Sequence, residues 1–333
     1  MTTASRQLLA IGHTPVDIVA SAGEAFLAAN GLTKGRQHKI SLETAEAMGN
    51  QLDALHYHAG GAAANVACCF AILGGEAGFD GKCADDALGR FFMDAFEGTG
   101  VTPIRPPIAD PRGSDHIFVL ITPDHERTFA AYYGINTEVS TDELDREAIA
   151  NSETTFLEGF QLTSNGGGDY LLAAADMARR AGRQVAFAPS DINIIAGHKQ
   201  ACRDLLQYAD ILIANIAEAR ALLDMPDSAD ADDVLAAMRA ASYAGGLTFG
   251  ADGATVYRGD DVHYQPAAAI THDTIVNTNG AGDHFAGGLL YGLTQGHDIG
   301  QCAGIGVSLA ARCLQRTGAR PERGDAEIMI QAG

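Results

Sequence analysis

Short apolar stretches alternate with longer amphipathic stretches along this chain of 333 residues. The short stretches predict strands at Leu8–Ile11, Ala77–Lys82, Thr155–Glu158, Val185–Ala188, Ile211–Ala214 and Leu247–Gly250. The longer ones predict helices at Ala62–Leu73, Leu88–Glu97, Tyr170–Ala181, Ile216–Leu223, Val234–Ala241 and Ile299–Gln315. Such alternation predicts an α/β fold with a mostly parallel central sheet, in which ligands bind beyond the carboxyl ends of the strands.

Two segments interrupt this alternation. In the first, which runs to Leu42, apolar residues alternate with polar neighbours from Val16 onward. The second is rich in proline and then carries two short strands, Ile117–Thr122 and Arg127–Tyr133, whose connecting turn predicts a β-hairpin. We therefore expect a single catalytic domain over residues 1–333 with a small β-sheet lid built from two segments, 13–42 and 102–135.

Composition and charge narrow the range of partners. The formal net charge of −20 argues against a nucleic-acid partner, because phosphate backbones require clustered Lys and Arg. The longest apolar run, Ala62–Leu73, is too short to span a bilayer, and the N-terminal stretch lacks the layout of a secretory signal. The six cysteines form no C-x-x-C pair, so we expect reduced core thiols and a cytoplasmic protein without a membrane partner.

The stretch Asn277-Thr278-Asn279-Gly280-Ala281-Gly282-Asp283 joins an extended segment to an apolar helix. Phe285, Leu289 and Leu293 recur every fourth residue, so one face of this helix is buried from its first turn. The small residues would let an anion approach the free N–H groups and the positive dipole end of the helix. Asp283 is then either a helix-start residue or a base beside a phosphoryl group.

Three other places combine small or amide residues with a predicted strand end. Gly60-Gly61 precedes a helix in which Asn65 is either a capping or core-satisfied residue or a ligand-facing amide. Asn215 and Glu218 begin the next such helix in the manner of an ordinary stabilising helix start. The stretch Thr248-Phe249-Gly250-Ala251-Asp252-Gly253 joins two strands, and its Asp-Gly dipeptide by itself indicates a two-residue hairpin turn.

In their order along the chain, these motifs resemble the signatures of the ribokinase/PfkB family of small-molecule kinases, from Gly12 to Arg320. The resemblance implies a ribokinase-like three-layer αβα domain. The 277–283 stretch is similar to the family pattern Asp-Thr-x-Gly-Ala-Gly-Asp, with Asn277 in place of the first Asp. It implies that Asp283 takes the proton of the acceptor hydroxyl, and that an anion hole for the phosphate is formed by the amides of Gly280, Ala281 and Gly282.

The same resemblance assigns residues of the site to each of two substrates. It implies acceptor binding by Asp17, Gly60, Gly61 and Asn65. It implies ATP binding by Asn215, Thr248, Gly250 and Gly253. Glu218 would help to hold the Mg²⁺ of the nucleotide, through water because Mg²⁺ dehydrates reluctantly. At the family's monovalent-cation site, Asn277 offers an oxygen without charge, which implies weakened potassium binding.

Within the family, Gly12–Asp17, Gly31–Gly35, Tyr57–Gly61 and Gln315–Gly318 resemble the adenosine-kinase-like branch. This implies ATP-dependent phosphorylation of the 5′-hydroxyl of an adenosine-like nucleoside by a monomer or homodimer. A sugar kinase of the ribokinase or fructokinase type is the first alternative, and a non-catalytic nucleoside-binding regulator on the same fold is the second. One departure from the branch is Gln161, which stands where an aromatic residue is often found.

Overall fold

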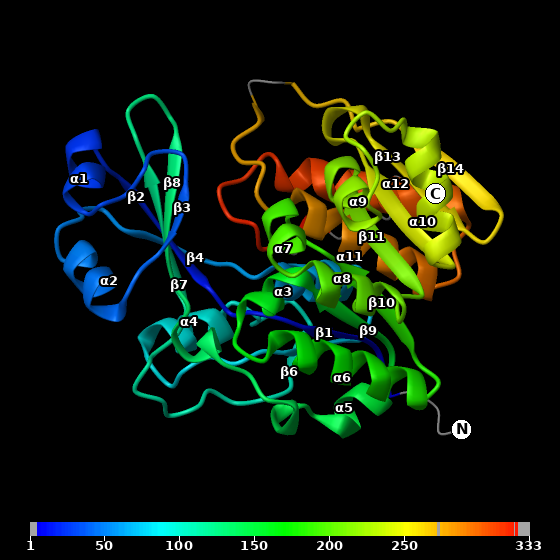
Figure 1. Cartoon of the computed structure of the whole chain (residues 1–333), viewed down its shortest axis with the longest axis horizontal. Coiled ribbons are helices and arrows are strands. Elements are labelled where there is room, and N and C mark those ends of the chain that lie inside the picture. The colour runs from blue at the N-terminus through cyan, green and yellow to red at the C-terminus, as the bar shows by residue number, and fades with distance from the viewer. Residues whose placement is uncertain (1–4, 272–273, 323, 326–333) are drawn as a thin grey trace.

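The computed structural model describes residues 5–271, 274–322 and 324–325, which form two sheets of different size (Figure 1). The large sheet has the strand order β14-β13-β12-β11-β10-β9-β1-β5-β6. Its strands are β1 Arg6–Ile11, β5 Ala77–Asp80, β6 Thr102–Pro103, β9 Ser152–Glu158, β10 Gln184–Ala188, β11 Ile211–Asn215, β12 Ala244–Thr248, β13 Ala254–Arg258 and β14 Asp261–Gln265. Neighbouring strands from β12 to β6 are parallel, and β13 and β14 add an antiparallel edge.

Helices cover both faces of the large sheet. Leu8 and Ala10 of β1 belong to one hydrophobic core, whereas Leu9 and Ile11 belong to the other, because successive side chains of a strand point to opposite faces. The first core is closed by α3 Ala62–Ile72, α4 Ala87–Asp94, α11 Ala281–Thr294 and α12 Ile299–Cys313. The second is closed by α5 Arg146–Ala150, α6 Gly167–Arg180, α7 Ile192–Gly197, α8 Lys199–Leu206, α9 Ile216–Leu222 and α10 Ala231–Ala241. The predicted three-layer α/β architecture is confirmed.

The small sheet stands apart from this body, on the left in Figure 1, and has the order β3-β8-β7-β2-β4. Its elements are β2 Val16–Ser21, β3 Gln37–Lys39, β4 His56–Ala59, β7 His116–Ile121, β8 Arg127–Tyr132, α1 Glu24–Ala29 and α2 Leu42–Gly49. Ile18 and Ala20 of β2 pack with Leu27 of α1 and Met48 of α2. The two helices therefore cover one face of the sheet, and we call this sheet with its helices the lid.

The structure refines the predicted boundaries of the lid. β7 and β8 form the predicted hairpin. β4 also belongs to the small sheet, beyond the predicted limit at residue 42, because it pairs with β2. β6, which the prediction assigned to the lid, pairs instead with β5 of the large sheet. The lid is therefore built from two stretches of chain that meet at β2 and β7, which run parallel to each other.

One local prediction is wrong. β12 and β13 do form a hairpin, but Thr248 pairs with Ala254, so residues 249–253 make the connection in place of a two-residue turn. This connection contains a 3₁₀ segment, Gly250–Asp252. Gly250 and Gly253 have φ angles of 62° and 98°, and a Cβ on Gly253 would lie 2.2 Å from the carbonyl oxygen of Gln265. The longer turn therefore depends on both glycines.

The structure also bears on the cysteines and on membrane contact. All six cysteines are buried free thiols, as expected. In the described part of the chain, no helix has the length and apolar character needed to cross a membrane.

Candidate active site

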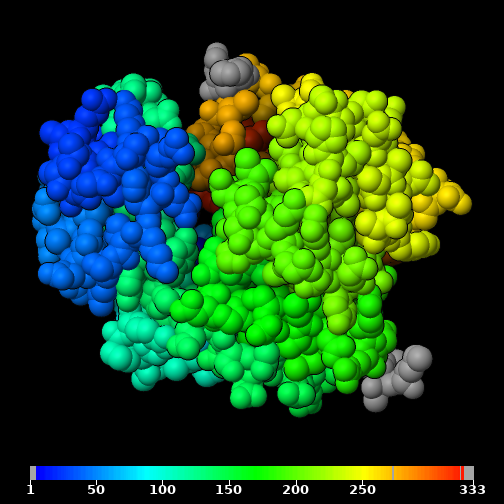
Figure 2. Space-filling model, in the orientation of Figure 1, coloured from blue at the N-terminus to red at the C-terminus, as the bar shows by residue number. Residues whose placement is uncertain are grey.

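A cleft separates the lid from the carboxyl ends of the large sheet's parallel strands (Figure 2). It contains a pocket of about 380 Å³. Asp17, His58 and Arg127 line this pocket from the lid, and Asn277 and Thr317 line it from the opposite side. Residues more than 250 positions apart in the sequence therefore line the same pocket. The α/β architecture predicts a ligand at this place.

The start of α11 forms one end of the site. Gly280 is its N-cap residue with φ 83°, and a Cβ there would lie 2.6 Å from the Cβ of Ala319. A Cβ on Gly282 would meet nothing within 4 Å, so open space lies in front of this residue. The first N–H groups of a helix lack intrahelical acceptors. The predicted anion-binding helix start is therefore present as a structural element, with room for an anion.

Asp283 lies in the first turn of α11 and meets Asn65 of α3. The Nδ2 group of Asn65 donates a hydrogen bond of 2.9 Å to Oδ2 of Asp283. Burial raises the pKa of Asp283 to about 6, although this hydrogen bond and the charge of Arg320 both lower it. A carboxylate with a pKa just below neutrality is suited to accept a proton. The buried Oδ1 atom of Asn65 has no hydrogen-bond partner among the described residues.

Asp17 lies on the uncovered face of the lid, beside the turn that begins α3. A Cβ on Gly60 would lie 3.3 Å from Oδ2 of Asp17, and one on Gly61, with φ 89°, would lie 2.6 Å from the carbonyl oxygen of His13. The two glycines therefore let this turn approach β2 closely. Burial raises the pKa of Asp17 to about 7, and Arg320 lowers it. No described residue donates a hydrogen bond to this carboxylate, which leaves its oxygens open to a ligand.

At the far side of the cleft, Asn215 and Glu218 cap α9 reciprocally. Oδ1 of Asn215 accepts from the backbone N–H groups of Ala217 (3.0 Å) and Glu218 (2.9 Å), and Oε2 of Glu218 accepts from the N–H of Asn215 at 3.0 Å. Burial raises the pKa of Glu218 to about 7, and Asp191 and Asp283 raise it further. Thr248 pairs with Asn215 in the sheet register. These residues thus gather at the carboxyl ends of β11 and β12.

The residues around Glu218 fit a metal ion that takes most of its ligands from water and phosphate rather than from protein side chains. Among the residues described, no three His, Cys, Asp or Glu side chains are arranged to hold a metal ion by themselves. Glu218 nevertheless interacts electrostatically with both Asp191 and Asp283. Mg²⁺ usually keeps several waters and takes phosphate oxygens as ligands, so this sparse set is compatible with a nucleotide-bound Mg²⁺.

Asn277 forms a hydrogen bond with a residue of the lid. Its Oδ1 accepts hydrogen bonds from Nη1 of Arg127 (2.8 Å) and from the N–H of Asn279 (3.0 Å). Its Nδ2 donates to the carbonyl oxygen of Thr317 at 2.9 Å. The amide oxygen therefore faces a guanidinium group, and weak cation binding at Asn277 stays a prediction. Sequence reasoning missed Arg127, because no local pattern in the hairpin marks it as a partner of the 277–283 stretch.

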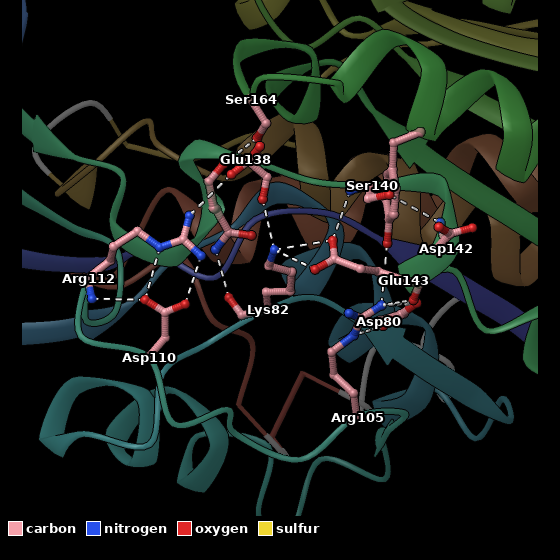
Figure 3. A network of polar contacts seen from close by, with 12 residues as sticks. Asp80, Lys82, Arg105, Asp110, Arg112, Glu138, Ser140, Asp142, Glu143 and Ser164 are labelled. Atoms are coloured by element: carbon pink, nitrogen blue, oxygen red, sulfur yellow. Dashed lines mark hydrogen bonds and ion pairs between the residues drawn. The ribbon is translucent and has the colours of Figure 1, made fainter.

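A network of polar contacts links β5 with the segments around residues 105–112 and 138–143 (Figure 3). Nζ of Lys82 donates to Oε1 of Glu143 and to the carbonyl oxygen of Glu138, both at 2.8 Å. Arg105 forms a two-armed ion pair with Asp80, at 2.6 and 3.0 Å. These cations are occupied by protein groups, so they tie β5 to the segment before α5 and are not available to a phosphate.

Sequence reasoning missed two further charged residues near the glycine turn. Glu158 ends β9, and its carboxylate accepts from the backbone N–H groups of His13 and Ala63, both at 2.7 Å. Burial raises the pKa of Glu158 to about 7. Arg320 donates from Nη2 to the carbonyl oxygen of Gly60 at 3.0 Å. The position of Glu158 at a strand end was a visible signal, whereas Arg320 follows a helix without any local motif.

Comparisons with known proteins show the family to which the chain belongs. The sequence model for "pfkB family carbohydrate kinase" matches residues 19–323. Aminoimidazole riboside kinase of Salmonella typhimurium is 31% identical over 244 residues, covering 71% of this chain and 74% of that protein. Adenosine kinase of Saccharomyces cerevisiae is 28% identical over 271 residues, covering 78% of each.

Solved structures extend the likeness over the whole fold. The structure of adenosine kinase from Sinorhizobium meliloti has a TM-score of 0.87 and 30% identity, covering 99% of this chain and 100% of that one. A probable sugar kinase from Rhizobium etli has a TM-score of 0.88 and 29% identity, covering 99% of each. The predicted ribokinase-like fold is confirmed. The chain therefore belongs to the pfkB family of carbohydrate kinases, and it is a phosphotransferase with an alcohol group as acceptor.

Proposed function

We propose that this enzyme transfers the γ-phosphoryl group of ATP to the 5′-hydroxyl of an adenosine-like nucleoside. The observation that carries the proposal is the composition of the pocket between the lid and the 276–279 loop. One part of its lining is polar and includes Asp17, and another part, which we call the slot, is aliphatic. A nucleoside has a polar ribose and a flat, largely apolar base, which match these two parts.

The slot follows from the sheet register of the lid. β2 and β7 pair Val19 with Val119 and Ser21 with Ile121, so these side chains share the uncovered face with Asp17. Val19, Val119 and Ile121 line the pocket on this face, and Val276 lines it from the other side. A planar base could lie between these aliphatic walls. Gln161 does not take part, because it is buried and donates to Ser164 elsewhere.

The ribose end of the pocket meets the catalytic groups. The Asp17 carboxylate would accept hydrogen bonds from two ribose hydroxyls, while Gly60 and Gly61 keep the backbone close to the sugar. Asn65 would orient the acceptor through its unpartnered Oδ1 and hold Asp283 through its Nδ2. The nucleoside's 5′-oxygen would then approach the start of α11.

The chemical step follows from these positions. Asp283 accepts the proton as the O–H bond of the acceptor breaks; the acceptor oxygen bonds to the γ-phosphorus, and the bond to ADP breaks. The N–H groups of Gly280, Ala281 and Gly282 would stabilise the charge on the transferring group. Bound Mg²⁺ would neutralise charge on the ATP phosphates, with Glu218 reaching it through water. ATP would be held by Asn215, Thr248, Gly250 and Gly253.

The lid would close over both substrates and exclude water, which limits transfer of the phosphoryl group to water. Contact between Arg127 and Asn277 supports this role, since it already joins the lid to the loop before the anion hole. We also place the enzyme in the cytoplasm, in keeping with its six unpaired thiols.

A screen of acceptors with MgATP tests the proposal. We expect kcat/KM to be higher for adenosine or a related purine nucleoside than for free ribose or fructose. Asp17→Ala should raise KM for the acceptor by about 100-fold or more, the loss of two hydrogen bonds to a charged group, with little change in KM for ATP. Asp261→Ala, on the exposed far edge of the large sheet, is the control. A clearly higher kcat/KM for a free pentose or hexose would make the enzyme a sugar kinase.

ADP formation without any acceptor requirement would argue against the kinase mechanism altogether. A protein that binds nucleosides but forms no ADP with any of them would instead be a regulator on the same fold.

A further inference from the structure

Behind the proposed acceptor site lies a guanidinium group to which the sequence analysis assigned no role. We propose that Arg320 is a positioning residue: it holds the Gly60–Gly61 turn in place and supplies the positive charge behind Asp17 and Asp283. This inference rests on the proposed roles of those two carboxylates.

Arg320 joins three separate elements. It follows α12, its Nη2 donates to the carbonyl oxygen of Gly60 at 3.0 Å, and its Nη1 lies 3.7 Å from Sγ of Cys68 on α3. The guanidinium carbon also lies 5.2 and 5.1 Å from the ring centres of Phe92 and Phe96, which is cation–π geometry. Since Gly61 is the N-cap residue of α3, fixing Gly60 also fixes the helix that carries Asn65.

Arg320 has no direct acidic partner among the described residues. Two other partly buried arginines, by contrast, do have one: Arg316 contacts Asp325 at 2.5 Å, and Arg105 contacts Asp80 at 2.6 Å. Arg320 forms no ion pair with a described residue, and its buried Nε has no hydrogen-bond partner among them. A purely structural arginine in such a place gains little stability, because desolvating an unpaired charge is costly.

The charge acts instead on the two carboxylates through space. Arg320 lowers the pKa of Asp17 and of Asp283, opposing the burial that raises both. The other ionisable groups that interact with Asp283 are acids or thiols: Glu158, Glu218, Cys69 and Cys313. Next to Asp17, the lid offers His58, its partner in the register of β2 and β4, whose pKa burial lowers. In the described part of the chain, Arg320 is therefore the cation that acts on both carboxylates.

Two consequences follow for the enzyme. Asp283 would stay mostly deprotonated at neutral pH, and Asp17, with a pKa near 7, would keep a substantial ionised fraction for hydroxyl binding. Removing the charge should shift the acidic limb of activity toward higher pH, and removing the hydrogen bond to Gly60 should weaken acceptor binding without weakening ATP binding.

The test compares Arg320→Met, Arg320→Lys and Arg316→Met. The methionine at 320 keeps the apolar stem but removes charge and donors, and the lysine keeps the charge but not the planar fork. Arg316→Met breaks the ion pair with Asp325 in the same segment and serves as the structural control. Measurements are kcat/KM for adenosine between pH 5 and 9, Kd for adenosine by calorimetry without ATP, KM for ATP, and Tm.

For Arg320→Met we expect the acidic limb to move up by roughly half a pH unit or more, less than a directly paired arginine would cause. Its Kd for adenosine should rise by about tenfold, the effect of losing one charge-assisted hydrogen bond, with an unchanged KM for ATP. Arg320→Lys should keep the limb near that of the wild type yet raise Kd. Arg316→Met should lower Tm without changing the acidic limb or the Kd for adenosine.

The inference is overturned if Arg320→Met lowers Tm but leaves the limb and Kd unchanged. If that variant does not fold, Arg320→Lys decides, because an unchanged Kd would exclude a positioning role. Failure of the proposed mechanism looks different: Asp283→Asn would then remain active, which would overturn this inference as well.

Discussion

Asn65 and Asp283 are 218 positions apart in the chain, yet the amide of the first donates a 2.9 Å hydrogen bond to the carboxylate of the second. The contact exists because α3 and α11 pack side by side with their first turns together. A Cβ on Gly287 of α11 would lie 2.4 Å from the Cβ of Cys69 on α3, so a glycine is required where the helices cross. The start of α3, beside the Gly60–Gly61 turn, and the start of α11, which we propose as the anion hole, are thereby joined.

Replacement of the carboxylate tests whether Asp283 is the base. Asp283→Asn should lower kcat by about 10²–10⁴-fold, the usual effect of losing a general base. The amide can still accept a hydrogen bond from Asn65, so the fold and ATP binding should persist. Steady-state kinetics, calorimetric ATP binding and Tm together measure this. Near-normal turnover in the variant would rule out the mechanism.

The pH dependence of activity should report the same carboxylate. With the pKa of Asp283 near 6, the base is ionised above that pH, and kcat at saturating acceptor should fall as the pH drops through about 6. kcat/KM for the acceptor should already fall below about pH 7, because Asp17 titrates there. Asn65→Leu removes the donor that favours the charged form, so the pKa should rise and the acidic limb should move to higher pH. The profile is measured at saturating MgATP. An acidic limb at the same pH in Asn65→Leu would show that another group titrates.

Potassium should activate this enzyme weakly or not at all. The Oδ1 atom of Asn277 carries no charge and already accepts hydrogen bonds from Arg127 and Asn279. Cation sites depend on ligand charge as well as ligand number. The measurement is kcat in potassium against kcat in a large organic cation at matched ionic strength. Many-fold activation by potassium that is unchanged in Asn277→Asp would contradict the prediction, because backbone oxygens alone would then suffice.

Lys82 should matter for stability and not for catalysis, because its ammonium group is bonded to Glu143 and Glu138. Lys82→Met should lower the free energy of unfolding by about 1–3 kcal/mol, less than the ~3–5 kcal/mol for a fully buried pair. The reason is that 33% of the Glu143 side chain is exposed. Denaturant unfolding measures the loss.

A double-mutant cycle with Glu143→Gln provides the control for Lys82. The two changes should be non-additive, since each removes the same ion pair. Additive effects, or a raised KM for ATP in Lys82→Met, would show that the ammonium group serves a ligand.

Several features of this protein could be predicted from the sequence because they depend on neighbouring residues. The alternation of strands and helices, the apolar–polar alternation of β2 and the hairpin of β7 and β8 all follow from side-chain periodicity and turn composition. The glycine-rich start of α11 also follows locally, since its glycines, its N-cap and Asp283 lie within one turn. The reciprocal cap of Asn215 and Glu218 is local in the same sense.

Other features were decided only by the tertiary structure. Three hydrogen bonds of the site join residues far apart in the sequence: Asn65 with Asp283 over 218 positions, Arg127 with Asn277 over 150, and Arg320 with Gly60 over 260. None has a local pattern, because each forms only after α3, α11 and the lid have packed. The inclusion of β4 in the lid was likewise settled by pairing with β2. Backbone preferences act over a few residues, whereas the burial and charge that tune this site come from elements that only the complete fold brings into contact.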